Sequence, residues 1–206
     1  MGASIADSRY PAALAHEPIE EIFPDIFLVH GSARVAPAMR MNRNMIIARD
    51  GEALTLIGSV RLSKTEEAKL ENLGSVKHVV RIGYYHGIDD RYYVERYGAE
   101  FWCPEAAILI KAHGGLLITC DSLQHWTDWS YCTLLAKMVV RIFGFSLRTL
   151  IGTFWLKSMT PKAGSLKADF ERLLKLNFKH LIGAHGRLCR VRAHQGVEAE
   201  VRHVFG

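Results

Sequence analysis

One histidine and two aspartates lie between an apolar run and a helical segment of this sequence. Residues 76–82 are apolar and predict a buried strand, and residues 90–97 predict a helix. His86, Asp89 and Asp90 lie where the strand gives way to the helix. Imidazole and carboxylate groups are common ligands of zinc, iron and manganese, so this junction is suited to hold a metal ion. It is equally suited to a plain helix start, with Asp89 as the N-cap and Asp90 stabilised by the helix dipole.

Two further apolar runs also end in residues that bind metals. Residues 116–120 precede Asp121, and residues 180–182 precede His185. If these runs are strands of a sheet packed against helices, their carboxyl ends meet at the edge where sites gather. The predicted ligands of one divalent ion are His86, Asp90, Asp121 and His185.

Most of these residues also have a purely structural interpretation. Asp121 fits a turn or a helix N-cap, and His86 fits a histidine that is hydrogen-bonded to backbone. His185 is harder to explain in this way, because its Gly-Ala-His-Gly turn has nothing apolar to bury. His125 follows Asp121 closely and is a weaker candidate for the same site. The histidines taken as structural or surface residues are His30, His78, His113, His180, His194 and His203.

Local patterns predict the elements that position these side chains. Residues 19–31 predict two short strands or one strand with a turn, and residues 31–43 predict a loop. Strands and helices alternate after that, which predicts an α/β fold with helices packed on a sheet. The clearest local signals are a hairpin turn at Asp50-Gly51, a capping box of Ser63 with Glu66, and a helix end at Gly74.

The composition is that of an ordinary globular protein. With 206 residues, 49% of them hydrophobic and 23% charged, the chain suits a single domain over residues 1–206. Residues 1–18 are expected to form a loose arm. The net charge of +5 is spread along the chain without a basic stripe, so we expect no nucleic-acid partner.

The cysteines and the N-terminus point to a cytoplasmic location. The cysteines are far apart and form no C-x-x-C pair, which argues against a thiolate zinc site or a redox motif. We expect them to be reduced. The first residues lack the basic start and apolar core of a secretory signal.

Residues 131–160 are strongly apolar and are predicted to form a helical insertion or lid. Lys137, Arg141, Arg148 and Lys157 interrupt the apolar run, which argues against a membrane span. The segment is expected to cover the core or a partner. One alternative stays open, in which the segment forms a basic amphipathic helix that touches a membrane surface. Whether the protein forms an oligomer also stays open.

These motifs resemble those of the metallo-β-lactamase fold superfamily over most of the chain. EIFPDIFLVHG is similar to its opening strands, and NMIIARDGEALTLIGSV is similar to its next hairpin. His86 and Asp90 fall on its His-x-His-x-Asp-His motif, Asp121 on its metal-bridging aspartate and His185 on its last histidine. The resemblance implies a four-layer αββα sandwich, one or two metal ions, and hydrolysis by a metal-activated hydroxide.

The departures from the family pattern bear on the metal. Ile88 and Arg91 stand at two histidine positions of the motif, and Gly58 stands at an expected aspartate. The family's middle histidine has no clear equivalent, since His113 lacks its context. Arg91 is expected either to repel a metal ion or to pair with a carboxylate, Asp90 or Asp121, in its place.

By the family pattern, one of the two metal sites is lost. The second keeps three of its four ligands, namely Asp90, Asp121 and His185, with His86 as a fourth ligand or base. One hypothesis is therefore a hydrolase with a single zinc, iron or manganese ion, in which His86 and Asp90 are catalytic and the small-molecule substrate is apolar or amphipathic.

Two other hypotheses do not require catalytic activity. In one, the chain is an inactive relative of the fold that serves as a binding or structural protein without metal. In the other, it binds a membrane surface or a partner protein through residues 131–159.

Overall fold

The computed structural model describes residues 9–83, 85–103 and 107–206. The chain divides into two compact units, and neither of them is a continuous stretch of sequence. Unit 1 consists of residues 1–33 and 43–105, and unit 2 consists of residues 34–42 and 106–206.

Unit 1 is built on a sheet whose strands follow one another in chain order. Its elements are β1 (Glu20–Phe23), β2 (Ile26–Ala36), β3 (Met39–Asp50), β4 (Ala53–Ile57), α1 (Lys64–Leu73), β5 (Ser75–Val80), α2 (Asp90–Tyr97) and β6 (Glu100–Trp102). Within the described residues the sheet has six strands in the order β1-β2-β3-β4-β5-β6. β1 with β2 and β3 with β4 are antiparallel, whereas β4, β5 and β6 run parallel.

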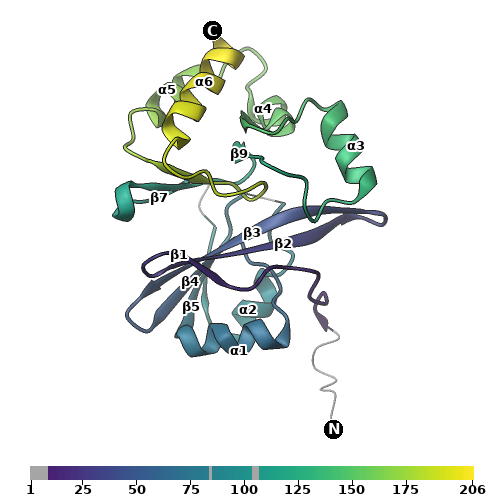
Figure 1. The fold of residues 1–206 in the computed structure, drawn as a ribbon, viewed down its shortest axis with the longest axis vertical. Helices are drawn as coiled ribbons and strands as arrows, with labels where there is room; N and C mark the ends of the chain where they lie inside the picture. The colour runs from purple at the N-terminus through teal and green to yellow at the C-terminus, as the bar shows by residue number, and fades with distance from the viewer. Residues whose placement is uncertain (1–8, 84, 104–106) are drawn as a thin grey trace. The chain divides into compact units, whose positions relative to one another are not determined.

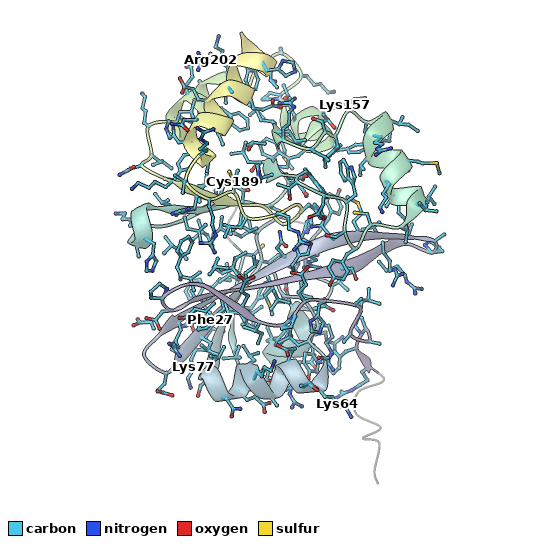
Figure 2. All side chains as sticks on the ribbon, in the orientation of Figure 1. Phe27, Lys64, Lys77, Lys157, Cys189 and Arg202 are labelled. Carbon is cyan, nitrogen blue, oxygen red and sulfur yellow. The ribbon has the colours of Figure 1, made fainter. Side chains whose placement is uncertain are left out.

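The helices of unit 1 begin and end at the predicted signals. The Ser63 side chain accepts a hydrogen bond from the backbone N–H of Glu66 over 3.4 Å, which confirms the N-terminal half of the capping box. Figure 1 shows α1 and α2 beside the same sheet. Both helices contribute to one apolar core, in which Leu70 of α1 and Tyr93 of α2 meet Phe27 of β2 (labelled in Figure 2).

The predicted loop over residues 31–43 is wrong, because β2 runs to Ala36 and β3 starts at Met39. The two strands form a long hairpin whose tip, residues 34–42, belongs to unit 2. There Met39 and Met41 pack against a core cluster around Trp126. The basic residues and the proline of this segment suggested a loop, but the alternating methionines are the stronger signal.

Within the residues that the structure describes, unit 2 holds two further sheets and most of the helices. Its elements are β7 (Ile108–Ile110), a 3-10 turn η2 (Ala112–Gly114), β8 (Leu116–Ile118), β9 (Leu123–His125), α3 (Leu134–Ile142), β10 (Thr149–Ile151), α4 (Thr153–Met159), α5 (Lys167–Leu173), β11 (His180–Ile182) and α6 (Ala193–Phe205). β11 and β8 are parallel, β8 and β7 are antiparallel, and β9 pairs with β10 separately.

The apolar residues 131–160 contain two helices, α3 and α4, with the short strand β10 between them. Ala136 and Val140 of α3 pack into the Trp126 cluster, and Ile151 of β10 packs into a second core that includes Phe170 of α5. None of the helices in the described part of the chain is long and apolar enough to cross a membrane.

Candidate metal centre

Asp121 and His185 are brought together in unit 2 by two neighbouring strands. Asp121 lies in the link that follows β8, and His185 lies in the turn that follows β11. Because β8 and β11 are adjacent and parallel, their carboxyl ends lie side by side. The Nε2 atom of His185 is 3.4 Å from Oδ1 of Asp121.

A backbone carbonyl fixes the orientation of the His185 ring. Nδ1 of His185 lies 2.6 Å from the carbonyl oxygen of Asn42, which belongs to the hairpin tip of unit 2. A carbonyl oxygen only accepts, so Nδ1 carries the proton and donates it. In the neutral ring, Nε2 then has a lone pair that faces the Asp121 carboxylate. The indole of Trp126 stacks on the imidazole, with ring centroids 6.3 Å apart.

Residues close to Asp121 in the sequence contact its carboxylate. The Gln124 side-chain N–H donates to Oδ1 over 3.4 Å, and Trp126 Nε1 in turn donates to the Gln124 oxygen over 2.9 Å. The thiol of Cys120 lies 3.7 Å from Oδ2. These contacts orient the carboxylate before any ligand binds.

Cys120 is a candidate ligand that the sequence argument missed. It was set aside because no second cysteine lies at metal-site spacing, yet its thiol and the adjacent Asp121 carboxylate offer ligand atoms within 4.8 Å of each other. Both residues come after the last residue of β8, where the alternation of a strand no longer separates neighbouring side chains. A cysteine next to a predicted ligand at a strand end is the signal that would have found it.

The turn that carries His185 packs tightly against β9. A Cβ atom on Gly186 would lie 2.2 Å from the carbonyl oxygen of His125, and Gly186 has a φ of 83°. The side chain of Asn42 donates to the Gly186 carbonyl over 3.1 Å. Glycine is therefore required at this position by both space and backbone conformation.

An ion pair closes the turn on its other side. Arg187 Nε donates to Oδ2 of Asp128 over 3.0 Å, and Nη2 of Arg187 donates to the Ser130 hydroxyl over 3.0 Å. Burial alone raises the pKa of the Asp128 carboxyl, but hydrogen bonds from Ser130 and the Arg187 guanidinium together lower this pKa to about 2. Arg187 and Asn42 thus hold the turn from both ends.

In unit 1, Asp90 is paired with a cation from its own unit. Its Oδ2 accepts a hydrogen bond from Arg81 Nε over 2.7 Å. The Asp90 side chain is 2% exposed, and its other oxygen has no hydrogen-bond partner within the described residues. The expected partner, Arg91, instead pairs with Glu95 one helical turn along α2. The positive charge that balances Asp90 therefore comes from Arg81, which directly follows β5. It does not come from Arg91, which stands at a histidine position of the family motif.

His86 and Asp89 lie close to buried arginines of the same unit. The carbonyl oxygen of His86 accepts a hydrogen bond from Arg43, and His86 itself is 9% exposed. Asp89 occupies the N-cap position of α2 but makes no side-chain cap bond. Its Oδ2 instead accepts from the backbone N–H of Arg61 over 3.1 Å. Burial raises the pKa of Asp89, and the nearby Arg43 charge opposes this shift.

The weaker histidine candidates have other partners. His125 Nδ1 lies 2.8 Å from the Thr149 hydroxyl, and burial lowers the pKa of His125. His180 Nε2 lies 3.2 Å from the carbonyl oxygen of His113. The second contact joins β11 to the turn η2, which fits the structural role expected of His180.

No protein-family model matches the sequence, and no curated protein matches it. Solved structures do match its fold. The protein TMB-1, in a structure concerned with substrate and inhibitor binding, is 10% identical, with 95% of this chain and 100% of that chain covered and a TM-score of 0.53. The metallo-β-lactamase FIM-1 from Pseudomonas aeruginosa, in its mono-zinc form, is 6% identical, with 91% and 96% covered and a TM-score of 0.53.

A third match has the same character. An NDM_FIM-1 like metallo-β-lactamase from Erythrobacter litoralis, also in a mono-zinc form, is 7% identical, with 89% and 94% covered and a TM-score of 0.54. At these identities the likeness shows the fold alone. It confirms the predicted fold class, the αββα sandwich of metallo-β-lactamase type. This chain is therefore a divergent protein of the metallo-β-lactamase fold.

Proposed function

We propose that this protein is a metal-dependent hydrolase. Its one metal site has fewer ligands than the family pattern and binds a single divalent ion through Asp121 and His185. The observation that carries the proposal is the 3.4 Å approach of His185 Nε2 to the Asp121 carboxylate, while Nδ1 is bound to the Asn42 carbonyl. In the neutral ring these are two acceptors that face each other and repel. A cation between them, either a proton on Nε2 or a metal ion, removes the repulsion.

The surroundings fit a metal ion. Ligating histidines commonly donate their other ring N–H to a backbone carbonyl, and His185 has this arrangement with Asn42. Cys120 adds a thiol beside the carboxylate. Thiolate and imidazole ligands suit zinc better than manganese, so zinc is the proposed ion ahead of iron and manganese. The mono-zinc form of FIM-1 supports a single zinc ion by analogy of fold.

When bound, such an ion lowers the pKa of coordinated water and supplies hydroxide near neutral pH. The chain's own residues would prepare the site for this chemistry. Gln124 orients the Asp121 carboxylate, and Asn42 holds the His185 tautomer that keeps Nε2 free of a proton. The proposed substrate is a small molecule with a hydrolysable bond.

The catalytic roles predicted for His86 and Asp90 stay predictions. Both residues belong to unit 1, and Arg81 already neutralises Asp90 there. A metal ion would have to compete with the Arg81 guanidinium for the Asp90 carboxylate. Asp90 is therefore the weaker candidate of the two.

The test is elemental analysis of protein purified without chelators. We expect about one equivalent of zinc per chain, and less than about a tenth of that in Asp121→Asn and in His185→Gln. Asp169→Asn and His203→Gln are the matched controls, since both residues are exposed in unit 2 outside the proposed site, and both variants should keep the metal. Circular dichroism would show that each variant is folded.

The alternative is a metal-free relative of the fold that binds a partner or serves a structural role. Two arginines of unit 1 favour it, because the buried Arg43 and the partly exposed Arg81 place positive charge beside Asp89 and Asp90. Wild-type protein without zinc, iron or manganese would decide for this alternative. Full metal content in both ligand variants would show instead that a metal binds at other residues.

A further inference from the structure

One face of α3 is apolar and exposed. Leu134, Met138 and Ile142 are spaced by four residues and therefore lie along one side of the helix. Leu134 is 78% exposed and Ile142 is 80% exposed. The opposite side of α3 is already occupied, since Ala136 and Val140 are buried in the Trp126 cluster. The exposed face is thus not needed to hold the helix in place.

The exposed face continues from α3 onto α4. Phe143 at the end of α3 lies against Phe154 of α4, with ring centroids 4.2 Å apart. The hydroxyl of Thr153 donates to the Phe143 carbonyl over 3.0 Å and fixes this junction. Leu147, in the connection after α3, is also exposed. The α3–α4 apolar surface is defined by Leu134, Met138, Ile142, Phe143, Leu147 and Phe154.

Positive charges accompany this surface, and negative ones are missing from its sequence. Residues 129–168 contain no aspartate or glutamate. Lys137 and Arg141 lie on α3, and Lys157 lies on α4, where Figure 2 labels it. Arg40 of the hairpin tip is exposed and is held next to the start of α3, because its carbonyl accepts from the Thr133 N–H over 3.1 Å.

We propose that the α3–α4 apolar surface docks unit 2 onto a lipid bilayer that carries anionic headgroups. Apolar side chains that protrude from a basic surface are the features with which peripheral proteins bind such membranes. In this arrangement Leu134, Met138 and Ile142 enter the boundary between headgroups and acyl chains. The lysines and arginines contact the anionic headgroups.

The same features disfavour other occupants. A second copy of the chain would bring the same positive charges to the interface, and like charges repel. The docking does not involve Asp121 or His185, so it can be tested separately from the proposed metal centre.

The experiment is flotation of the full chain with lipid vesicles at low salt. Vesicles of phosphatidylcholine with about 30% phosphatidylglycerol should carry the protein upward, and vesicles of phosphatidylcholine alone should not. The double variant Leu134→Ser/Ile142→Ser should lose binding. Arg141→Gln and Lys157→Gln should each weaken binding about fivefold, and added salt should weaken it further. Val191→Ser, at an exposed apolar residue outside this surface, should bind as the wild type does.

Three results would overturn the proposal. One is wild-type protein that stays unbound with anionic vesicles. Another is equal binding by wild type and the Leu134→Ser/Ile142→Ser variant, with near-ultraviolet circular dichroism showing that both are folded. The third is a wild-type dimer in light scattering that the double variant converts to a monomer, since the surface would then join two copies. These outcomes are independent of the metal content of the protein.

Discussion

His185 and Asn42 are joined by a 2.6 Å hydrogen bond although 143 positions separate them in the sequence. The bond ties the turn after β11 to the tip of the β2–β3 hairpin. The Asn42 side chain adds a second connection, because it donates to the Gly186 carbonyl over 3.1 Å. One residue of the hairpin therefore sets both the ring tautomer of His185 and the path of the backbone that carries it.

Replacement of Asn42 by alanine should loosen the proposed metal centre without removing a ligand. The carbonyl that accepts from His185 stays, but the side-chain bond to Gly186 is lost. We expect zinc affinity to fall about tenfold, as for other changes to groups that orient ligands. Competition with a chromophoric chelator would measure it, and Asn177→Ala, at an exposed asparagine of unit 2, is the control. Unchanged affinity would show that the ring keeps its orientation by other means.

Gly186→Ala should destabilise unit 2 more than Gly144→Ala. The two glycines have nearly the same φ, 83° and 80°. A Cβ atom at Gly186 would lie 2.2 Å from the His125 carbonyl oxygen, whereas one at Gly144 meets nothing within 4 Å. We expect a loss of about 1 kcal/mol at Gly144 from the backbone alone, and about 3 kcal/mol at Gly186. Urea denaturation would measure both, and equal losses would contradict the steric argument.

Arg81→Met should destabilise unit 1 by leaving the Asp90 carboxylate buried without its cation. Asp90 is 2% exposed, and Arg81 is 30% exposed, so solvent weakens part of the effect. We expect a loss of about 2 kcal/mol in the free energy of unfolding. The second substitution Asp90→Asn should restore much of this stability, because it removes the unpaired charge. A double-mutant cycle by urea denaturation tests this, and additive losses would show that the two side chains do not interact.

Acid should weaken unit 2 through Asp128. Its pKa in the folded protein is about 2, below the value of about 3.9 in an unfolded chain. The ion pair with Arg187 therefore contributes fully above about pH 4, and the contribution is lost as the pH falls through about 2. Because Asp128 is 43% exposed, solvent screening reduces this contribution. Carbon NMR of the carboxyl group would give the pKa, and Asp128→Asn should flatten the change in unfolding free energy between these pH values.

The sequence predicted the fold through signals that act over short distances. The hairpin turn at Asp50-Gly51, the cap at Ser63 and the strand over residues 180–182 all lie where local patterns placed them. These features depend on backbone conformation and on one or two neighbouring side chains. The hairpin tip was missed because its two methionines pack against the cluster around Trp126, which lies far along the chain.

The candidate site was only partly predictable for the same reason. Adjacent parallel strands bring Asp121 and His185 together, so the rule about strand ends was sufficient for this pair. Pairing with Arg91 was one of the alternatives for Asp90, whereas the bond comes from Arg81. Side-chain reach decides between two arginines that are both near in sequence, and a sequence pattern contains no such information.

The division of the β2–β3 hairpin between the two units has a consequence for how the chain folds. Unit 2 includes residues 34–42, which are synthesised long before residues 106–206. The Asn42 carbonyl can therefore bind His185 only after nearly the whole chain has been synthesised. Closing such a long loop is slow. Refolding experiments should find that the His185 environment forms late, after the local structure of unit 1 is in place.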